Sequence, residues 1–186
     1  PNVIARKQVE EISRRYTQVL ETMAAAPSGF YNEVDLLQPA EKALLLEEWN
    51  RTERDYPNDA CVHELIRKQS QLRPESIAVK GSNSSLSYGE LAEMADRVTR
   101  SLVTRGVRPG DNVAVFLDRK PELIAALVGI WQAGAAYVPL DPAFPSERLA
   151  FMLADSGASV VLSETRLRDM VPQTQALVLE IETALA

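Results

Sequence analysis

Apolar residues in the first part of the chain recur at helical spacing. Over residues 3–23 they fall at intervals near three and four, with glutamate and arginine on the opposite side. This period predicts an amphipathic helix. Because no apolar segment follows closely, the stripe must pack on a later part of the chain or on another protein. The stripe consists of Val3, Ile4, Val9, Ile12, Tyr16, Val19, Leu20 and Met23.

Residues 24–60 predict a connection with two short ordered pieces. A short extended piece is expected over residues 33–37, and a helix over residues 40–49. Pro39 suits the first position of that helix, since its missing N–H would have no partner there. The polar stretch 50–60 shows no hydrophobic period and therefore predicts an interdomain linker.

Helical periods alternate with short apolar runs from residue 61 onward. The pattern predicts helices at 61–72, 88–105, 121–133, 146–156 and 165–170, and extended segments at 77–80, 86–87, 113–117, 137–140, 159–162 and 177–179. The unbroken apolar runs 113–117 and 159–162 are typical of strands covered on both faces. The expected fold class is therefore α/β, in which an N-terminal helical linker segment precedes part of a mostly parallel sheet with flanking helices and right-handed crossovers.

Local signals mark several helix ends. Ser87 and Glu90 have the S-x-x-E spacing of a capping box at the start of the helix 88–105. Gly106 and Gly157 follow helical segments, where glycine adopts the left-handed conformation at least cost. These residues predict well-defined helix ends and need no catalytic explanation.

The stretch WQAGAAYVPLDP, residues 131–142, organises the second half of the chain. An almost wholly apolar helix over 121–133 runs into it, which predicts a buried helix. Gly134 ends that helix, and a short strand follows. Asp141 precedes Pro142, and the residue before a proline is driven out of the helical region, so a turn is expected there.

Composition excludes several classes of function. The net charge of −6 and the pI near 5.0 argue against a nucleic-acid partner, and no block of lysine and arginine is present. No apolar run approaches the roughly 18–20 residues that a membrane span needs. Residues 1–30 lack the apolar core of a signal peptide. We therefore expect a cytoplasmic location without a membrane partner.

The single cysteine and the single histidine offer little chemistry. Cys61 has no second cysteine to pair with, which suits a reducing compartment, and it is expected to be a small buried or half-buried thiol. His63 is the only histidine, so a histidine-rich metal site is excluded. We interpret His63 as structural.

Phosphate-binding and catalytic motifs are not found. The sequence has no G-x-G-x-x-G; Gly129 and Gly134 have the spacing of a phosphate loop, but Ala135 and Ala136 follow instead of lysine and a hydroxyl residue. Five carboxylates could serve as general bases, yet each is better explained as a turn, helix-start or surface charge. These are Asp118, Glu122, Asp141, Glu147 and Asp155. The residues themselves assign no catalytic, cofactor-binding or metal site.

Three segments together resemble a known family. LSYGEL at 86–91, RPGDNVAVFLDR at 108–119 and LVGIWQAGAAYVPLDPAFPSERLAFMLADSGASVVLSE at 127–164 are similar, in order and spacing, to the first two core motifs of nonribosomal peptide synthetase adenylation domains. LLQPAEKALLLEEWNRTERDYP at 36–57 resembles the linker between a condensation domain and an adenylation domain. The helix 3–23 is similar to the closing helix of a condensation domain.

The resemblance implies a domain division. Residues 1–60 would be the end of a condensation domain with the interdomain linker. Residues 61–186 would be the N-terminal portion of an adenylation domain, an incomplete large subdomain of the adenylate-forming, AMP-binding enzymes. The expected function is that of a fragment of a multidomain ligase of secondary metabolite biosynthesis, which contributes scaffold and does not catalyse alone.

The resemblance also implies an activity for the full module. Such enzymes activate an amino acid with ATP and magnesium as an aminoacyl adenylate, and transfer it to the phosphopantetheine thiol of a carrier domain. The implied partners are the neighbouring condensation domain, the remaining adenylation domain, the carrier domain and the amino-acid substrate. The family's phosphate loop, substrate pocket and catalytic lysine come after this stretch. Tyr88, Asp141 and Arg148 match family-typical positions and are interpreted as fold positions.

Two alternatives stay open at this point. An acyl-CoA-ligase-type enzyme would share the fold, although the linker EWNRTERDYP argues against it. A non-enzymatic docking or interaction module is favoured only by the apolar stripe of the helix 3–23.

Overall fold

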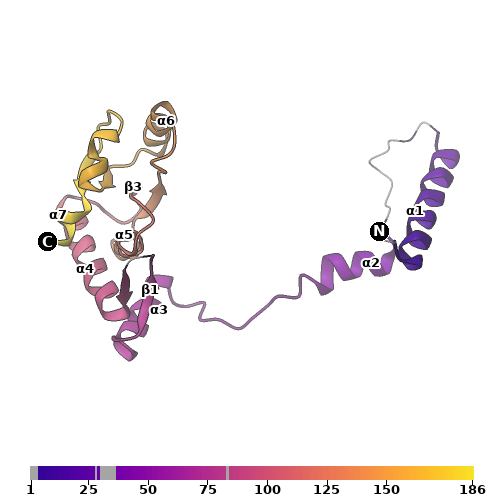
Figure 1. Cartoon of the computed structure of the whole chain (residues 1–186), viewed down its shortest axis with the longest axis horizontal. Helices are drawn as coiled ribbons and strands as arrows, with labels where there is room; N and C mark the ends of the chain where they lie inside the picture. Colours follow the sequence, from indigo (N-terminus) through magenta and orange to yellow (C-terminus); the bar gives the residue numbers. More distant parts are fainter. Residues whose placement is uncertain (1–3, 28, 30–36, 83) are drawn as a thin grey trace. The chain divides into compact units, whose positions relative to one another are not determined.

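The chain divides into two compact units, Pro1–Tyr56 and Pro57–Ala186. The computed structural model describes residues 4–27, 29, 37–82 and 84–186, and Figure 1 labels several of their helices and strands. The extended piece expected over 33–37 lies, except for Leu37, outside the described residues. Each unit is a separate body and is described by itself.

The first unit contains two helical segments. Helix α1 spans Arg6–Ala25; α2 spans Pro39–Ala43 and continues into a π-helical turn, η2, over Leu44–Glu48. Both expected helices are confirmed, while the π-helical turn was not predicted. Most described side chains of the apolar stripe of α1 are exposed within this unit, Val19 is half-buried, and no described residue of α1 is fully buried. The exposed side chains of the stripe are Ile4, Val9, Ile12, Tyr16, Leu20 and Met23.

The second unit alternates helices and strands, as expected. In chain order it contains α3 Val62–Leu72, β1 Ile77–Lys80, β2 Ser85–Ser87, α4 Tyr88–Thr104, β3 Asn112–Phe116, α5 Pro121–Gln132, β4 Ala136–Pro139, α6 Ser146–Ser156, β5 Val160–Ser163, the 3-10 helix η3 Thr165–Met170, β6 Leu177–Glu180 and α7 Ile181–Leu185. The predicted α/β class is confirmed. Helix α7 was not predicted. Within the described ranges, no helix combines the length and the apolar character needed to cross a bilayer.

The larger sheet is wholly parallel, with strand order β4-β3-β5-β6. Strand β3 leads through α5 to β4 on one side, and β4 leads through α6 to β5 on the other. These two connections move in opposite directions along the sheet. Right-handed crossovers therefore place α5 and α6 on opposite faces.

Side chains of the sheet alternate between two apolar clusters. Val113, Val115 and Leu162 point into a cluster with residues of α4, α5 and α7. Ala114, Phe116 and Val161 belong to the other cluster, which α6 and η3 cover. Burial on both faces explains why β3 and β5 read as unbroken apolar runs.

Strands β1 and β2 lie outside the parallel sheet. They form a separate two-stranded antiparallel sheet, with Lys80 opposite Ser85. The physical reason is local: two short strands that follow each other closely in the sequence pair antiparallel, whereas a parallel neighbour needs a long crossover.

The capping box at the start of α4 is confirmed. The Ser87 backbone N–H donates to Glu90 Oε2 at 2.7 Å, and the Glu90 N–H donates to Ser87 Oγ at 3.2 Å. The Ser87 backbone N–H lowers the pKa of the Glu90 carboxyl below its ordinary value, because it stabilises the charged form. Gly134 and Gly157 end α5 and α6 with φ of 74° and 58°, as expected for left-handed residues.

The expectation for Cys61 was wrong, because its side chain is exposed. Cys61 is the N-cap of α3, and its N–H donates to Glu64 Oε2 at 2.7 Å. The cap position lies outside the helix, in line with its exposure. His63, in the first turn of the same helix, is half-buried.

Candidate functional site

The geometry of the parallel sheet indicates where a ligand crevice would lie. In open α/β sheets, ligands bind outside the carboxyl ends of two adjacent strands whose connections leave in opposite directions. The connection after β3 leads to β4, and the connection after β5 leads to β6 on the other side. The candidate site is therefore the space beyond the ends of β3 and β5, next to residues 117–120 and 164–166.

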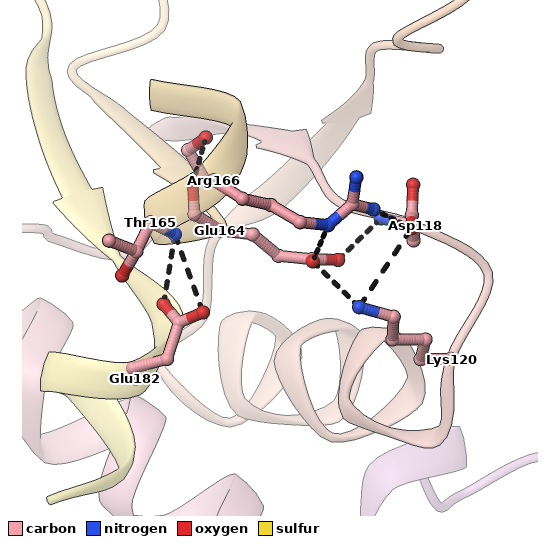
Figure 2. A network of polar contacts seen from close by, with 7 residues as sticks. Asp118, Lys120, Glu164, Thr165, Arg166 and Glu182 are labelled. Atoms are coloured by element: carbon pink, nitrogen blue, oxygen red, sulfur yellow. Dashed lines mark hydrogen bonds and ion pairs between the residues drawn. The ribbon is translucent and has the colours of Figure 1, made fainter. Parts of the chain in front are cut away.

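A buried carboxylate occupies this position. Glu164 is 6% exposed, and its Oε1 accepts a hydrogen bond of 2.9 Å from the Asp118 backbone N–H. Its Oε2 accepts from Lys120 Nζ at 2.7 Å and from Arg166 Nε at 2.9 Å. Arg166 also forms an ion pair with Asp118, as Figure 2 shows. We call these four residues the Glu164 network; it joins the loop after β3 to the loop after β5.

The surroundings of Lys120 favour its charged form. The hydrogen bond to Glu164 is the main reason that the pKa of Lys120 rises above its ordinary value. The carboxylates of Glu122 and Glu182 add to this effect through their negative charges. Glu182 of α7 also accepts the Thr165 N–H at 3.2 Å. Glu182 thus ties the segment after β5, next to the network, to helix α7.

A cavity of about 210 Å³ lies beside the Glu164 network. Its lining includes Asp118, Glu122, Glu164 and Glu182, with Lys120 as the single cation that the described residues contribute. Glu122 Oε2 is buried there and meets no hydrogen-bond donor among the described residues. Because this lining is mostly negative, the residues do not fit the triphosphate of ATP. Within the described ranges, no cluster of histidine, cysteine, aspartate and glutamate suits a metal ion.

The chemistry available to the Glu164 network is limited. Glu164 accepts three hydrogen bonds, so both of its oxygens are engaged. Lys120 is charged and paired, which removes its value as a nucleophile. The arrangement positions two loops at the carboxyl edge of the sheet.

The five carboxylates considered as candidate bases lie in different places in the structure. Asp118 and Glu122 line the same cavity. Asp141 accepts the Ala143 N–H at 2.9 Å, which is the turn expected at this position. Glu147 and Asp155 are exposed on α6.

The two remaining family-typical residues contact aromatic or basic neighbours. Tyr88 is half-buried, and the guanidinium of Arg73 lies 5.9 Å from its ring centre. The guanidinium of Arg148 lies 4.0 Å from the ring centre of Phe144. Both residues lie outside the lining of the cavity beside the Glu164 network, as far as the described residues define it.

Sequence reasoning missed three members of the Glu164 network: Lys120, Glu164 and Arg166. The available signal was the position of charged residues directly after two unbroken apolar strands. The carboxyl ends of neighbouring parallel strands meet at one edge, so such residues are brought together.

Replacing Glu164 with glutamine tests this network. We expect the free energy of unfolding to fall by about 1 kcal/mol, because the amide loses charge-assisted hydrogen bonds from Lys120 and Arg166. The pKa of Lys120 is raised, so its stabilising contribution is complete below the ordinary lysine value of 10.5 and disappears as the pH rises through the raised value. The difference between the wild type and the variant, measured by urea denaturation, should therefore shrink above pH 10.5.

The matched control for this experiment is Glu147→Gln. Glu147 is exposed on α6, so the midpoint urea concentration of unfolding should be the same for this variant and the wild type. Equal stability of the Glu164→Gln variant and the wild type at pH 7 would show that the network does not support the fold.

A comparison with family models identifies one family. The model described as "AMP-binding enzyme" matches residues 66–185, which lie within the second unit. Among curated proteins, a linear gramicidin synthase of Brevibacillus parabrevis is 36% identical over 182 residues. The alignment covers 98% of this chain and 2% of that protein. The chain thus spans a small part of this relative's length.

Among solved structures, the chain is also similar to nonribosomal peptide synthetases. The nonribosomal peptide synthetase FmoA3 matches with a TM-score of 0.71 and 34% identity, over 98% of this chain and 20% of that chain. The four-domain nonribosomal peptide synthetase AB3403, solved with AMP and glycine, matches with a TM-score of 0.73 and 32% identity. That match covers 97% of this chain and 14% of the other. The similarity therefore includes the helical first unit as well as the sheet.

Proposed function

Because the chain belongs to the AMP-binding enzyme family, we propose that it is the entry part of an adenylation domain in a nonribosomal peptide synthetase. Residues 61–186 form the N-terminal portion of that domain. Residues 1–60 form the end of a condensation domain and the interdomain linker. The observation that carries the proposal is the similarity of nearly the whole chain to nonribosomal peptide synthetases, over 98% of it for FmoA3 and 97% for AB3403. The family match over residues 66–185 lies within the compact α/β unit.

The proposed activity is that of the whole module. It activates an amino acid with ATP and magnesium, forms an aminoacyl adenylate with release of pyrophosphate, and loads the acyl group on the phosphopantetheine thiol of a carrier domain. AB3403, solved with AMP and glycine, supports the use of ATP and an amino acid. The partners are the condensation domain, the rest of the adenylation domain and the carrier domain.

The contribution of this chain is proposed to be structural. The Glu164 network lies in the crevice beyond β3 and β5, and the mostly negative lining of the cavity beside it repels a triphosphate. The groups that bind ATP and the amino acid would therefore come from other parts of the domain. The exposed apolar stripe of α1 is assigned to packing within the condensation domain.

The test is ATP–pyrophosphate exchange in the protein that contains this chain, with each proteinogenic amino acid in turn. We expect exchange with one amino acid or a small group of them, and a matching mass increase on a phosphopantetheinylated carrier domain. The 186-residue chain assayed alone should give no exchange. Exchange by this chain alone would contradict the scaffold role.

A second assay distinguishes the synthetase proposal from the acyl-CoA-ligase alternative. The same protein is incubated with ATP, a panel of carboxylic acids and coenzyme A. Formation of an acyl-CoA, without loading of the carrier domain, would replace the synthetase proposal with that alternative.

A further inference from the structure

Helix α1 presents different chemistry on its two sides. Most described side chains of its apolar stripe are exposed in the first unit, and Val19 is half-buried. The half-buried residues of α1 include Glu11, Arg15 and Gln18, which lie on a polar side. A polar side that is more buried than the apolar side indicates a specific polar contact, because burial without partners is costly.

This contact joins α1 to the start of α2. Arg15 Nη2 donates to Glu41 Oε1 at 2.5 Å, and lies 3.7 Å from Glu11 Oε1. Gln38 Nε2 donates to Gln18 Oε1 at 3.3 Å. The two bonds between the helices span 26 and 20 residues of sequence, so they are tertiary contacts.

Glu41 has a second role in the same place. Its Oε2 accepts the Gln38 backbone N–H at 3.0 Å, which caps α2. That bond, followed by the contacts with Glu11 and Arg15, lowers the pKa of Glu41 below its ordinary value. One carboxylate thus both starts α2 and pairs with α1. The docking of α2 is therefore coupled to its formation.

We propose that Arg15 and Glu41 form a clasp that docks the helix Pro39–Glu48, made of α2 and η2, on the polar side of α1. The clasp leaves the apolar stripe of α1 available on its other side. It also assigns residues 38–48 to the same body as α1. Residues 51–59, which follow them, are exposed and contain no helix or strand. This inference is independent of the proposed function.

A double-mutant cycle in the full protein tests the clasp, with hydrogen exchange of the amides in residues 40–48 as the readout. The variants are Arg15→Gln, Glu41→Gln and the double variant. Glutamine at position 41 can still cap the helix, so the change removes mainly the ion pair. Each single variant should exchange about three- to five-fold faster in this segment, as for a partly exposed pair. The double variant should be no faster than either single variant.

Two matched controls use exposed residues of the same helices. Arg14→Gln and Glu47→Gln remove the same charges nearby and should leave the exchange unchanged. Unchanged exchange in the clasp variants, or effects that simply add in the double variant, would overturn the proposal. Loss of protection in α1 itself would also overturn it, because Arg15 would then support α1 and not the docking.

Discussion

Replacing Phe116 with alanine is expected to lower the free energy of unfolding of the second unit by about 3–5 kcal/mol. Phe116 lies in β3 and is fully buried, in the cluster that includes Leu149 and Leu153 of α6. Alanine would leave a cavity between the sheet and α6 that neighbouring side chains fill only in part. Urea denaturation followed by tryptophan fluorescence measures the loss; Trp131 reports on this unit when Trp49 is replaced by phenylalanine.

Phe151→Ala is the matched control for this prediction. Phe151 lies on α6 and is 69% exposed, so the same chemical change should alter the free energy of unfolding by less than about 0.5 kcal/mol. Similar losses in the two variants would mean that the burial of Phe116 between β3 and α6 does not stabilise the unit.

Replacing Gly129 with alanine is expected to lower the free energy of unfolding of the second unit by about 2 kcal/mol, the second largest effect predicted here. A Cβ atom at this position would lie 2.8 Å from the Ala95 carbonyl oxygen and 2.8 Å from Val98 Cβ. Both atoms belong to or adjoin the backbone of α4, so α4 and α5 would have to separate. Overpacking of this kind costs about 3 kcal/mol, offset by about 1 kcal/mol of improved helix propensity.

Gly89→Ala is the control for the close approach of α4 and α5 at Gly129. Gly89 is also helical, but a Cβ there would come no closer than 3.4 Å to any neighbour among the described residues. We expect no loss of stability in that variant, measured by the same urea denaturation. A Gly129→Ala variant as stable as the wild type would show that α4 and α5 can adjust their distance freely.

Helix ends were predicted well because their signals are local. Helix α6 and η3 have the predicted bounds, and Gly157 ends α6 with the expected positive φ. The capping box of Ser87 and Glu90 acts over three residues, so no distant contact is needed to form it. The buried strands β3 and β5 were recognised for a similar reason, since burial on both faces requires apolar side chains at every position.

The candidate site could not be predicted in the same way. Lys120 and Glu164 are separated by 44 residues, and only the parallel pairing of β3 with β5 brings them to 2.7 Å. In the sequence, each reads as an ordinary charge after a strand. The clasp between Arg15 and Glu41 is a comparable case, because helical periodicity indicates the apolar side of α1 and says nothing of what its polar side contacts.

Short-range patterns along the chain were enough to identify the family of this protein, the α/β class and the positions of most of its helices and strands. Side-chain periodicity, caps and motifs act within a few residues, so they can be read without a fold. Long-range packing was needed to establish the strand order β4-β3-β5-β6, the burial of Glu164 and the joining of two loops by Glu164. Each of these depends on which distant segments pack together, and the energy of that packing is shared among many residues. No single short stretch of sequence therefore contains it.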